Sequence, residues 1–174
     1  SFSLMLMRIL VFGGNGWIGQ QFVSVVNANA SSVSLVHRIA VERVDLDRIA
    51  NLEEEIDAFA PTHIISFLGR THGENFATID YLEQPGKLVE NVRDNLMAPI
   101  ILAQLCADRG IHYTYLGTGC IFNDTDACSD HAYAFKETDA PNFFGSSYSI
   151  VKGFTDRFMA WRHGQGRQGQ QGRQ

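Results

Sequence analysis

Residues 7–21 read MRILVFGGNGWIGQQ, and this stretch decides the fold. Arg8–Phe12 is an apolar run short enough for a buried parallel strand, and helical spacing begins at Trp17. Three glycines, Gly13, Gly16 and Gly19, follow the strand with the spacing GxxGxxG. The first lets the chain leave the strand sharply, the second lets the backbone approach a pyrophosphate, and the third lets helix and strand pack closely.

The helix that follows the glycines begins with Trp17 and Ile18. A helix N-terminus presents unpaired N–H groups and the positive end of a dipole, both of which attract phosphate. Glycine-rich turns also serve plain packing, which is the alternative reading. Because this one follows a strand and opens a helix, it predicts dinucleotide binding.

Composition restricts the class of protein. The chain has 174 residues, of which 45% are hydrophobic and 19% charged, as expected for one globular domain. A net charge of -5 argues against nucleic acid as a partner, and no apolar run approaches membrane-spanning length. The three cysteines are widely spaced, so we expect no disulfide framework and a reducing, cytoplasmic location. The histidines have no metal-ligand spacing, so no metal site is predicted.

Strands alternate with helices along the chain, which predicts an α/β fold with a doubly wound parallel sheet, a Rossmann-type domain. Ligands of such sheets bind at the carboxyl ends of the strands. Acids at 53–55 are expected on a solvated helix face. The expected further strands are Val33–Val36, Val41–Leu46, His63–Leu68 and His112–Leu116, and the expected helices cover 17–29, 47–60, 88–109 (interrupted at Pro99 and capped by Gly110) and a segment from about Ser146.

Arg38 follows the second expected strand, at the position that faces the adenosine ribose in dinucleotide folds. An arginine there accommodates a 2′-phosphate, so the sequence favours NADP (NADPH), with NAD as the alternative. A solvated loop arginine is the plainer interpretation. The polar loop from Arg70 to Glu83 is where substrate contacts are expected, and its candidates are Thr71, Asp80 and Glu83.

Tyr148 and Lys152 are four residues apart on a helix, so they lie on one face. An ammonium group beside a phenol favours the phenolate and should lower the pKa of Tyr148 from its usual value of about 10. Such a tyrosine exchanges a proton with a carbonyl oxygen at neutral pH. The YxxxK pattern also occurs by chance, but here the hydroxyl of Thr118 follows a strand end as a third member.

Three motifs carry a family resemblance: GGNGWIG at 13–19, GTGCIF at 117–122 and PNFFGSSYSIVK at 141–152. Together they resemble the extended short-chain dehydrogenase/reductases, in particular the nucleotide-4-keto-6-deoxyglucose 3,5-epimerase/4-reductases. The resemblance spans about residues 7–158. It implies an NADPH-dependent enzyme that converts UDP- or dTDP-4-keto-6-deoxyglucose to nucleotide-rhamnose.

The resemblance also implies roles for individual residues. Thr118 and Tyr148 would hold the C4 carbonyl, Tyr148 would protonate its oxygen, and Lys152 would tune Tyr148 and bind the nicotinamide ribose. The remaining implied contacts are Asp45 and Leu46 beside the adenine, Phe67, Leu68 and Gly69 along the cofactor, Asn95 supporting the active site, and Asn142 with the substrate.

Cys120 lies two residues after Thr118. A C4 ketone acidifies the hydrogens at C3 and C5, and a thiol is suited to remove and return such a proton. Its position matches the cysteine of the nucleotide-sugar epimerase/reductases, which implies a catalytic role. A small buried residue at a strand end is the alternative.

The end of the chain departs from the family pattern. Residues 164–174 contain only glycine, glutamine and arginine, which predicts a disordered tail. We therefore expect an N-terminal extension at 1–6, a C-terminally truncated NAD(P)-binding domain at 7–162 and a tail at 163–174. The uncovered sheet edge would favour a homodimer. Two alternatives stay open: another NAD(P)-dependent sugar-nucleotide reductase or epimerase/dehydratase, and a non-catalytic NADP-binding regulatory subunit.

Overall fold

The computed structural model describes residues 6–29, 35–123 and 135–171, and the side chains of 165–171 lie outside this description. Most of the expected extension at 1–6, the start of the expected strand at 33–34 and the last three residues of the tail also lie outside it. The chain divides into two compact units. Unit 1 comprises Ser1–Gly69 and Met97–Leu116, and unit 2 comprises Arg70–Leu96 and Gly117–Gln174.

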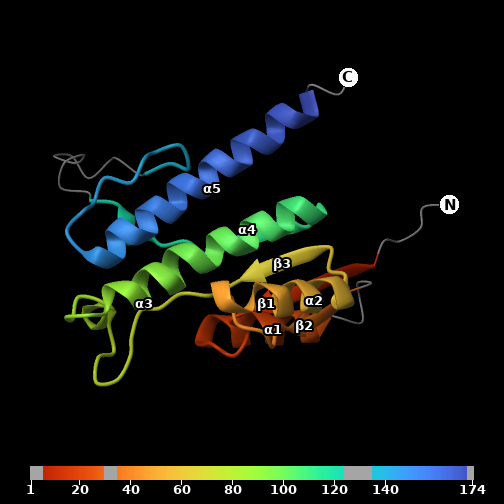
Figure 1. Cartoon of the computed structure of the whole chain (residues 1–174), viewed down its shortest axis with the longest axis horizontal. Coiled ribbons are helices and arrows are strands. Elements are labelled where there is room, and N and C mark those ends of the chain that lie inside the picture. Colours follow the sequence, from red (N-terminus) through yellow and green to blue (C-terminus); the bar gives the residue numbers. More distant parts are fainter. Residues whose placement is uncertain (1–5, 30–34, 124–134, 172–174) are drawn as a thin grey trace. The chain divides into compact units, whose positions relative to one another are not determined.

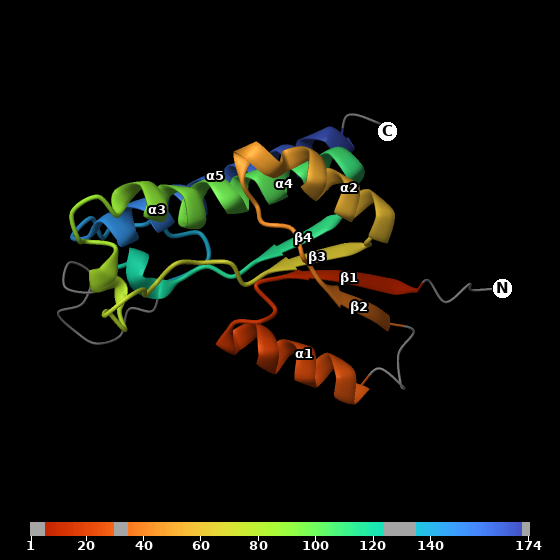
Figure 2. The same ribbon diagram turned by 60° about the horizontal axis from the view of Figure 1, so that its bottom comes forward.

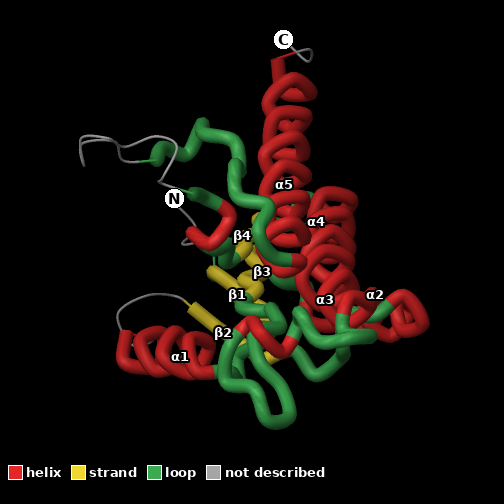
Figure 3. Tube along the Cα trace, turned by 90° about the vertical axis from the view of Figure 1, so that its left-hand side faces the viewer, coloured by secondary structure: helices red, strands yellow, loops and turns green. Residues whose placement is uncertain are grey.

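Unit 1 is built on a four-stranded parallel sheet with the order β2-β1-β3-β4. Helix α1 covers one face, and α2 and α4 cover the other (Figures 2 and 3). The predicted doubly wound, Rossmann-type fold is therefore confirmed. The bounds are β1 Met7–Phe12, α1 Trp17–Asn29, β2 Leu35–Ile39, α2 Ile49–Phe59, β3 His63–Ser66, α4 Ala98–Arg109 and β4 His112–Tyr115.

The core of unit 1 lies between the sheet and the α2/α4 face. Strand residues Leu10, Phe12 and Ile64 are almost completely buried there. They pack with Leu52, Ile56 and Phe59 of α2 and with Leu102, Leu105 and Cys106 of α4. Apolar residues three or four apart share one face of a helix, which brings Leu52, Ile56 and Phe59 of α2 together in this core.

The expected strand at Val41–Leu46 is wrong, since none of these residues lies in a strand. Glu55 of α2 accepts hydrogen bonds from the backbone N–H groups of Val41 (2.9 Å) and Glu42 (2.8 Å). Because these N–H groups are bonded to Glu55, they do not pair with a neighbouring strand. The chain continues into the 3-10 turn η1, Leu46–Arg48. Glu55 is consequently buried, which corrects the expectation that it is solvated. Within the described residues the preceding strand covers Leu35–Ile39, so it continues three residues beyond the expected end at Val36.

Unit 2 contains the polar loop and the helix that carries Tyr148. Helix α3 (Leu88–Val92) packs beside the first part of α5 (Ser147–Gln171), as Figure 1 shows. Two short 3-10 turns complete the unit: η2, Ile79–Tyr81, and η4, Gly119–Ile121. Helix α5 continues into the segment for which composition predicts disorder, and the boundary at residue 162 stays a prediction.

A π-helical segment, η3 (Arg93–Met97), separates α3 from α4. The expected interruption at Pro99 thus takes the form of a wider turn just before the proline. Pro99 has no N–H to donate, which disfavours regular α-helical bonding over that turn. Such π segments are frequent at functional sites. At the far end Gly110 caps α4 in the left-handed conformation, as predicted.

None of the helices in the described ranges combines the length and apolar composition required to cross a bilayer.

Candidate functional site

The glycine loop of unit 1 has the geometry of a phosphate cradle. Gly13 has a positive φ of 73°, and its carbonyl accepts the N–H of Gly16 at 3.0 Å. A Cβ on Gly19 would lie only 2.3 Å from the Gly13 carbonyl oxygen. Gly16, Trp17 and Ile18 are exposed at the start of α1, whereas Gly19 is buried. The start of α1, where the first backbone N–H groups have no partner within the helix, is therefore exposed.

The predicted cofactor-lining residues after β3 lie against this loop. A Cβ on Gly13 would meet the backbone of Phe67 at 3.0 Å and that of Leu68 at 3.1 Å. The Phe67 ring also packs on Phe22 of α1, with ring centroids 5.3 Å apart. Unit 1 thus brings Gly13, Phe67 and Leu68 together, with the exposed Gly69 directly after them.

Arg38 forms an ion pair with Glu55, with Nη2 2.7 Å from Oε1. The Arg38 side chain is 43% exposed while that of Glu55 is 4% exposed, so the guanidinium is held by the buried carboxylate and still reaches solvent. The expected adenine contacts lie further along the chain. Asp45 precedes η1, and Leu46, its first residue, is 58% exposed.

Unit 2 brings Thr118, Cys120 and Tyr148 together. The Thr118 side chain accepts the N–H of Cys120 at 3.2 Å and lies beside the Tyr148 phenol. Burial raises the pKa of Tyr148 above its usual value of 10.0, the polar Thr118 side chain acts in the opposite direction, and the nearby Cys120 raises the pKa further. The expectation of a lowered pKa is therefore not met, because desolvation of the phenol outweighs the effect of Thr118.

Lys152 lies one turn after Tyr148 on α5, and both side chains are buried. Burial lowers the pKa of Lys152 from 10.5 to about 8. Desolvation disfavours the charged form of each group, so the phenol and the amine are both shifted toward their neutral forms. Cys120, in contrast, is exposed.

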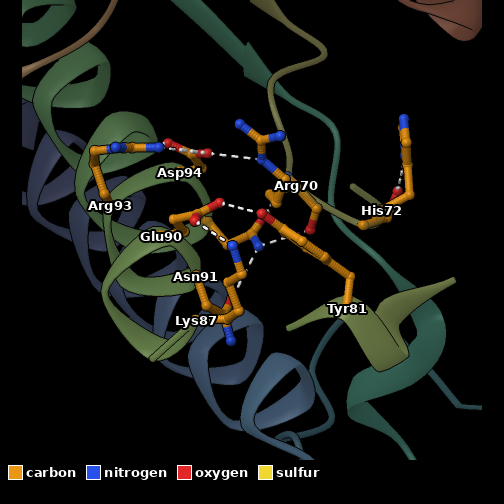
Figure 4. A network of polar contacts seen from close by, with 10 residues as sticks. Arg70, His72, Tyr81, Lys87, Glu90, Asn91, Arg93 and Asp94 are labelled. Carbon is orange, nitrogen blue, oxygen red and sulfur yellow. Dashed lines mark hydrogen bonds and ion pairs between the residues drawn. The ribbon is translucent and has the colours of Figure 1, made fainter. Parts of the chain in front are cut away.

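Asn95 is buried in the π segment and holds the start of the polar loop. Its side chain accepts the N–H of Arg70 at 2.9 Å and donates to the Arg70 carbonyl, also at 2.9 Å. Its amide also donates to Asn91 at 2.9 Å. A second anchor joins Arg70 to Asp94 at 3.0 Å (Figure 4). Asn95, which lies in η3, therefore fixes the start of the polar loop through these hydrogen bonds.

The predicted substrate residues of unit 2 occupy different surroundings. Thr71 is exposed and contacts His72, and Asp80 accepts the hydroxyl of Thr78 at 2.6 Å. Asn142 is occupied by the backbone of Asn123, whose N–H it accepts at 2.7 Å and whose carbonyl it contacts at 3.1 Å. Glu83 faces the N-terminus of α5, where it accepts the N–H groups of Ser147 and Tyr148.

Sequence reasoning missed the residues that support the site. Thr155 donates a hydrogen bond to the Asn95 carbonyl, Asn91 contacts Ser147, and Tyr81 packs beside Tyr148. The spacing of Asn91 and Asn95, four apart on a helix, was the one available signal for a shared polar face.

Residues 9–167 match the NAD dependent epimerase/dehydratase family. Because this match covers most of the chain, the chain belongs to that family, and the resemblance inferred from its motifs is confirmed.

Among the relatives is protein L780 of Acanthamoeba polyphaga mimivirus, 49% identical over 153 residues, which are 88% of this chain and 51% of L780. The crystal structure of L780, described as a UDP-rhamnose synthase, matches with a TM-score of 0.79 at 48% identity, over 91% of this chain and 53% of that one. The bifunctional dTDP-4-dehydrorhamnose 3,5-epimerase/dTDP-4-dehydrorhamnose reductase of Arabidopsis thaliana is 29% identical over 153 residues, 87% of this chain and 47% of that protein.

A dTDP-4-dehydrorhamnose reductase from Bacillus anthracis, solved with NADP, has the same fold, with a TM-score of 0.66 at 16% identity over 87% of this chain and 48% of that one. The chain thus spans about half the length of these relatives.

Proposed function

We propose that this chain is the cofactor-binding and proton-transfer part of a nucleotide-4-keto-6-deoxyhexose 3,5-epimerase/4-reductase, which makes a nucleotide-rhamnose. The observation that carries the proposal is that Thr118 and Cys120 lie beside the Tyr148 phenol. A binding module has no need of this proton-transfer set. The favoured substrate is a UDP-sugar, since the relative L780, described as a UDP-rhamnose synthase, is 48% identical.

The proposed reduction uses Tyr148 as the acid. Its phenol donates a proton to the C4 carbonyl oxygen, and Thr118 holds that oxygen by a second hydrogen bond. The raised pKa of Tyr148 keeps the phenol protonated and ready to donate at neutral pH. NADPH, when bound, supplies the hydride to C4.

The proposed epimerisation uses Cys120. The exposed thiol, as its thiolate, removes a proton from a carbon next to the C4 ketone and becomes the neutral thiol, while the ketone takes up the negative charge as an enolate. A solvent proton is then added to the opposite face of that carbon, which restores the ketone with inverted configuration, and the thiol loses its proton to solvent. The chemistry requires a free thiol, which fits the reducing cytoplasm expected from the cysteine spacing.

For the cofactor, Gly13, Gly16 and Gly19 form a cradle that fits a diphosphate, since an added Cβ at Gly13 or Gly19 would collide with neighbouring backbone. Arg38 supports NADPH over NADH, because its partly exposed guanidinium can pair with a 2′-phosphate.

Two variants test the proposal in heavy water. With the UDP-4-keto-6-deoxyglucose substrate alone, Cys120→Ala should stop deuterium incorporation at C3 and C5, whereas Tyr148→Phe should leave it intact. With NADPH added, Tyr148→Phe should slow reduction about 100-fold or more. Deuterium incorporation by Cys120→Ala at the unmodified rate would contradict the role of the thiol, and undiminished reduction by Tyr148→Phe that of the phenol.

A further inference from the structure

The carboxylate of Glu83 lies against the N-terminus of the helix that carries Tyr148. Its Oε2 accepts the N–H of Ser147 at 3.0 Å. Its Oε1 accepts the Ser147 hydroxyl at 2.8 Å and the Tyr148 N–H at 3.2 Å. The first N–H groups of a helix have no partner within the helix and carry its positive end. Glu83 therefore provides acceptors for the N–H groups of the first two residues of α5, Ser147 and Tyr148.

The segment around Glu83 is fixed to α3, so this cap comes from an ordered element. The Tyr81 hydroxyl donates to Glu90 at 2.8 Å, and the Lys87 ammonium lies 4.6 Å from the centre of the Tyr81 ring (Figure 4). Next to it, the buried Leu82 packs with Tyr81 and Tyr148 in one apolar cluster. Glu83 is thus held in place from α3 while it contacts α5.

Ser147 connects α5 to both the polar loop and α3. Its hydroxyl oxygen accepts the Asn91 amide at 3.1 Å and also lies 3.3 Å from the Leu82 carbonyl. The first turn of α5 is therefore tied both to the loop, through Glu83 and Leu82, and to α3, through Asn91. Because both oxygens of Glu83 point into this turn, its contacts are those of a structural cap.

We propose that Glu83 is a positioning residue for Tyr148: it fixes the first turn of α5 so that the phenol stays against Thr118, and it does not contact the sugar. The inference rests on the proposed function, which gives Tyr148 its role as the acid. Proton transfer depends steeply on geometry, and small displacements of a catalytic group cost large factors in rate.

Glu83→Gln removes the charge and places an amide donor against the N–H groups of α5. Glu54→Gln is a matched control, because it makes the same chemical change at an exposed carboxylate on α2. In Glu83→Gln we expect the Ser147 and Tyr148 amides to exchange their hydrogens roughly fivefold to tenfold faster. We also expect a shift of the ¹³Cζ NMR signal of Tyr148.

Both effects should be absent in Glu54→Gln. Unchanged exchange and an unchanged Tyr148 signal in Glu83→Gln would overturn the proposal. As a second measurement that needs no variant, the same two amide signals of the unmodified chain should move as Glu83 is protonated in acid, and signals that stay constant through that titration would count against it.

A kinetic measurement then separates positioning from substrate contact. In the reduction we expect Glu83→Gln to lower kcat about tenfold and to leave KM for the nucleotide-sugar unchanged. A raised KM with an unchanged kcat would make Glu83 a sugar contact and overturn the proposal. If the unmodified chain reduces no sugar, the proposed function fails, whereas the exchange and NMR measurements still decide the position of Tyr148.

Discussion

The hydroxyl of Thr155 donates a 2.6 Å hydrogen bond to the backbone carbonyl of Asn95, and both residues are buried. In a regular α-helix this carbonyl would accept the N–H of the residue four positions later. That residue is Pro99, which has no backbone N–H. The hydroxyl on α5 thus stabilises the π segment that presents the Asn95 side chain to the polar loop.

Thr155→Val keeps the shape of the side chain but removes the hydrogen bond, so we expect the free energy of unfolding to fall by about 1–3 kcal/mol. Thr155→Ser keeps the hydroxyl and serves as the control, with a smaller loss. Urea denaturation of the three chains makes the comparison. Equal stability of Thr155→Val and the unmodified chain would show that the carbonyl finds another partner.

The glycine loop gives a second prediction. Gly19→Ala places a Cβ 2.3 Å from the Gly13 carbonyl oxygen and 2.7 Å from the Gly14 Cα, and backbone on both sides leaves it no room. We expect the affinity for NADPH, measured by the fluorescence of its reduced ring, to fall about tenfold or more. Gly164→Ala is the control, because an added Cβ there meets nothing within 4 Å. Retained affinity in Gly19→Ala would exclude the loop as the phosphate cradle.

Cofactor preference should depend on Arg38. We expect Arg38→Ala to weaken NADPH binding about tenfold and to leave NADH binding unchanged, because only NADPH carries the 2′-phosphate. Titration with each cofactor measures both affinities. Arg48→Ala, which removes an exposed arginine only loosely paired with Glu42 at 3.8 Å, is the matched control. If Arg38→Ala weakened the binding of both cofactors equally, the role of Arg38 would be structural, through its ion pair with Glu55.

Burial of Lys152 predicts a pH dependence of stability. Its pKa is about 8 in the folded chain and 10.5 in the reference state, so between these values the unfolded chain binds more protons. The burial penalty is therefore fully present below pH 8 and is relieved as the pH rises toward 10.5. The penalty is on the order of 3 kcal/mol at most.

Comparison with Lys152→Met isolates this effect from other groups that titrate in alkali. The unmodified chain should gain stability relative to Lys152→Met as the pH is raised from 7 to 10, measured by urea denaturation at each pH. A difference that stays constant over this range would mean that Lys152 keeps an ordinary pKa in the folded chain.

Local pattern in the sequence predicted the parts of the fold that depend on neighbouring residues. Alternation of apolar runs and helical spacing gave β1, α1 and the parallel sheet, and the YxxxK spacing placed Tyr148 and Lys152 on one buried face. The hydroxyl after a strand end pointed to Thr118, and the family resemblance pointed to Cys120; both lie beside Tyr148.

The errors arose where a side chain is used by a distant part of the chain. Glu55 takes the backbone donors of Val41 and Glu42, which removed a strand that β-propensity had favoured. Glu83 was expected from the sequence as a substrate contact, and nothing in the sequence indicated its hydrogen bond to Ser147, 64 residues later. Neither periodicity nor spacing contains such contacts, because they depend on the tertiary arrangement.

The most direct test of the central claim is to incubate this chain with NADPH and UDP-4-keto-6-deoxyglucose in heavy water and to determine the product by mass spectrometry. We expect a reduced sugar that carries solvent deuterium at both C3 and C5, which requires epimerisation and reduction together. A reduced sugar without deuterium at these carbons, or the absence of reduced sugar, would contradict a bifunctional epimerase/reductase activity of this chain.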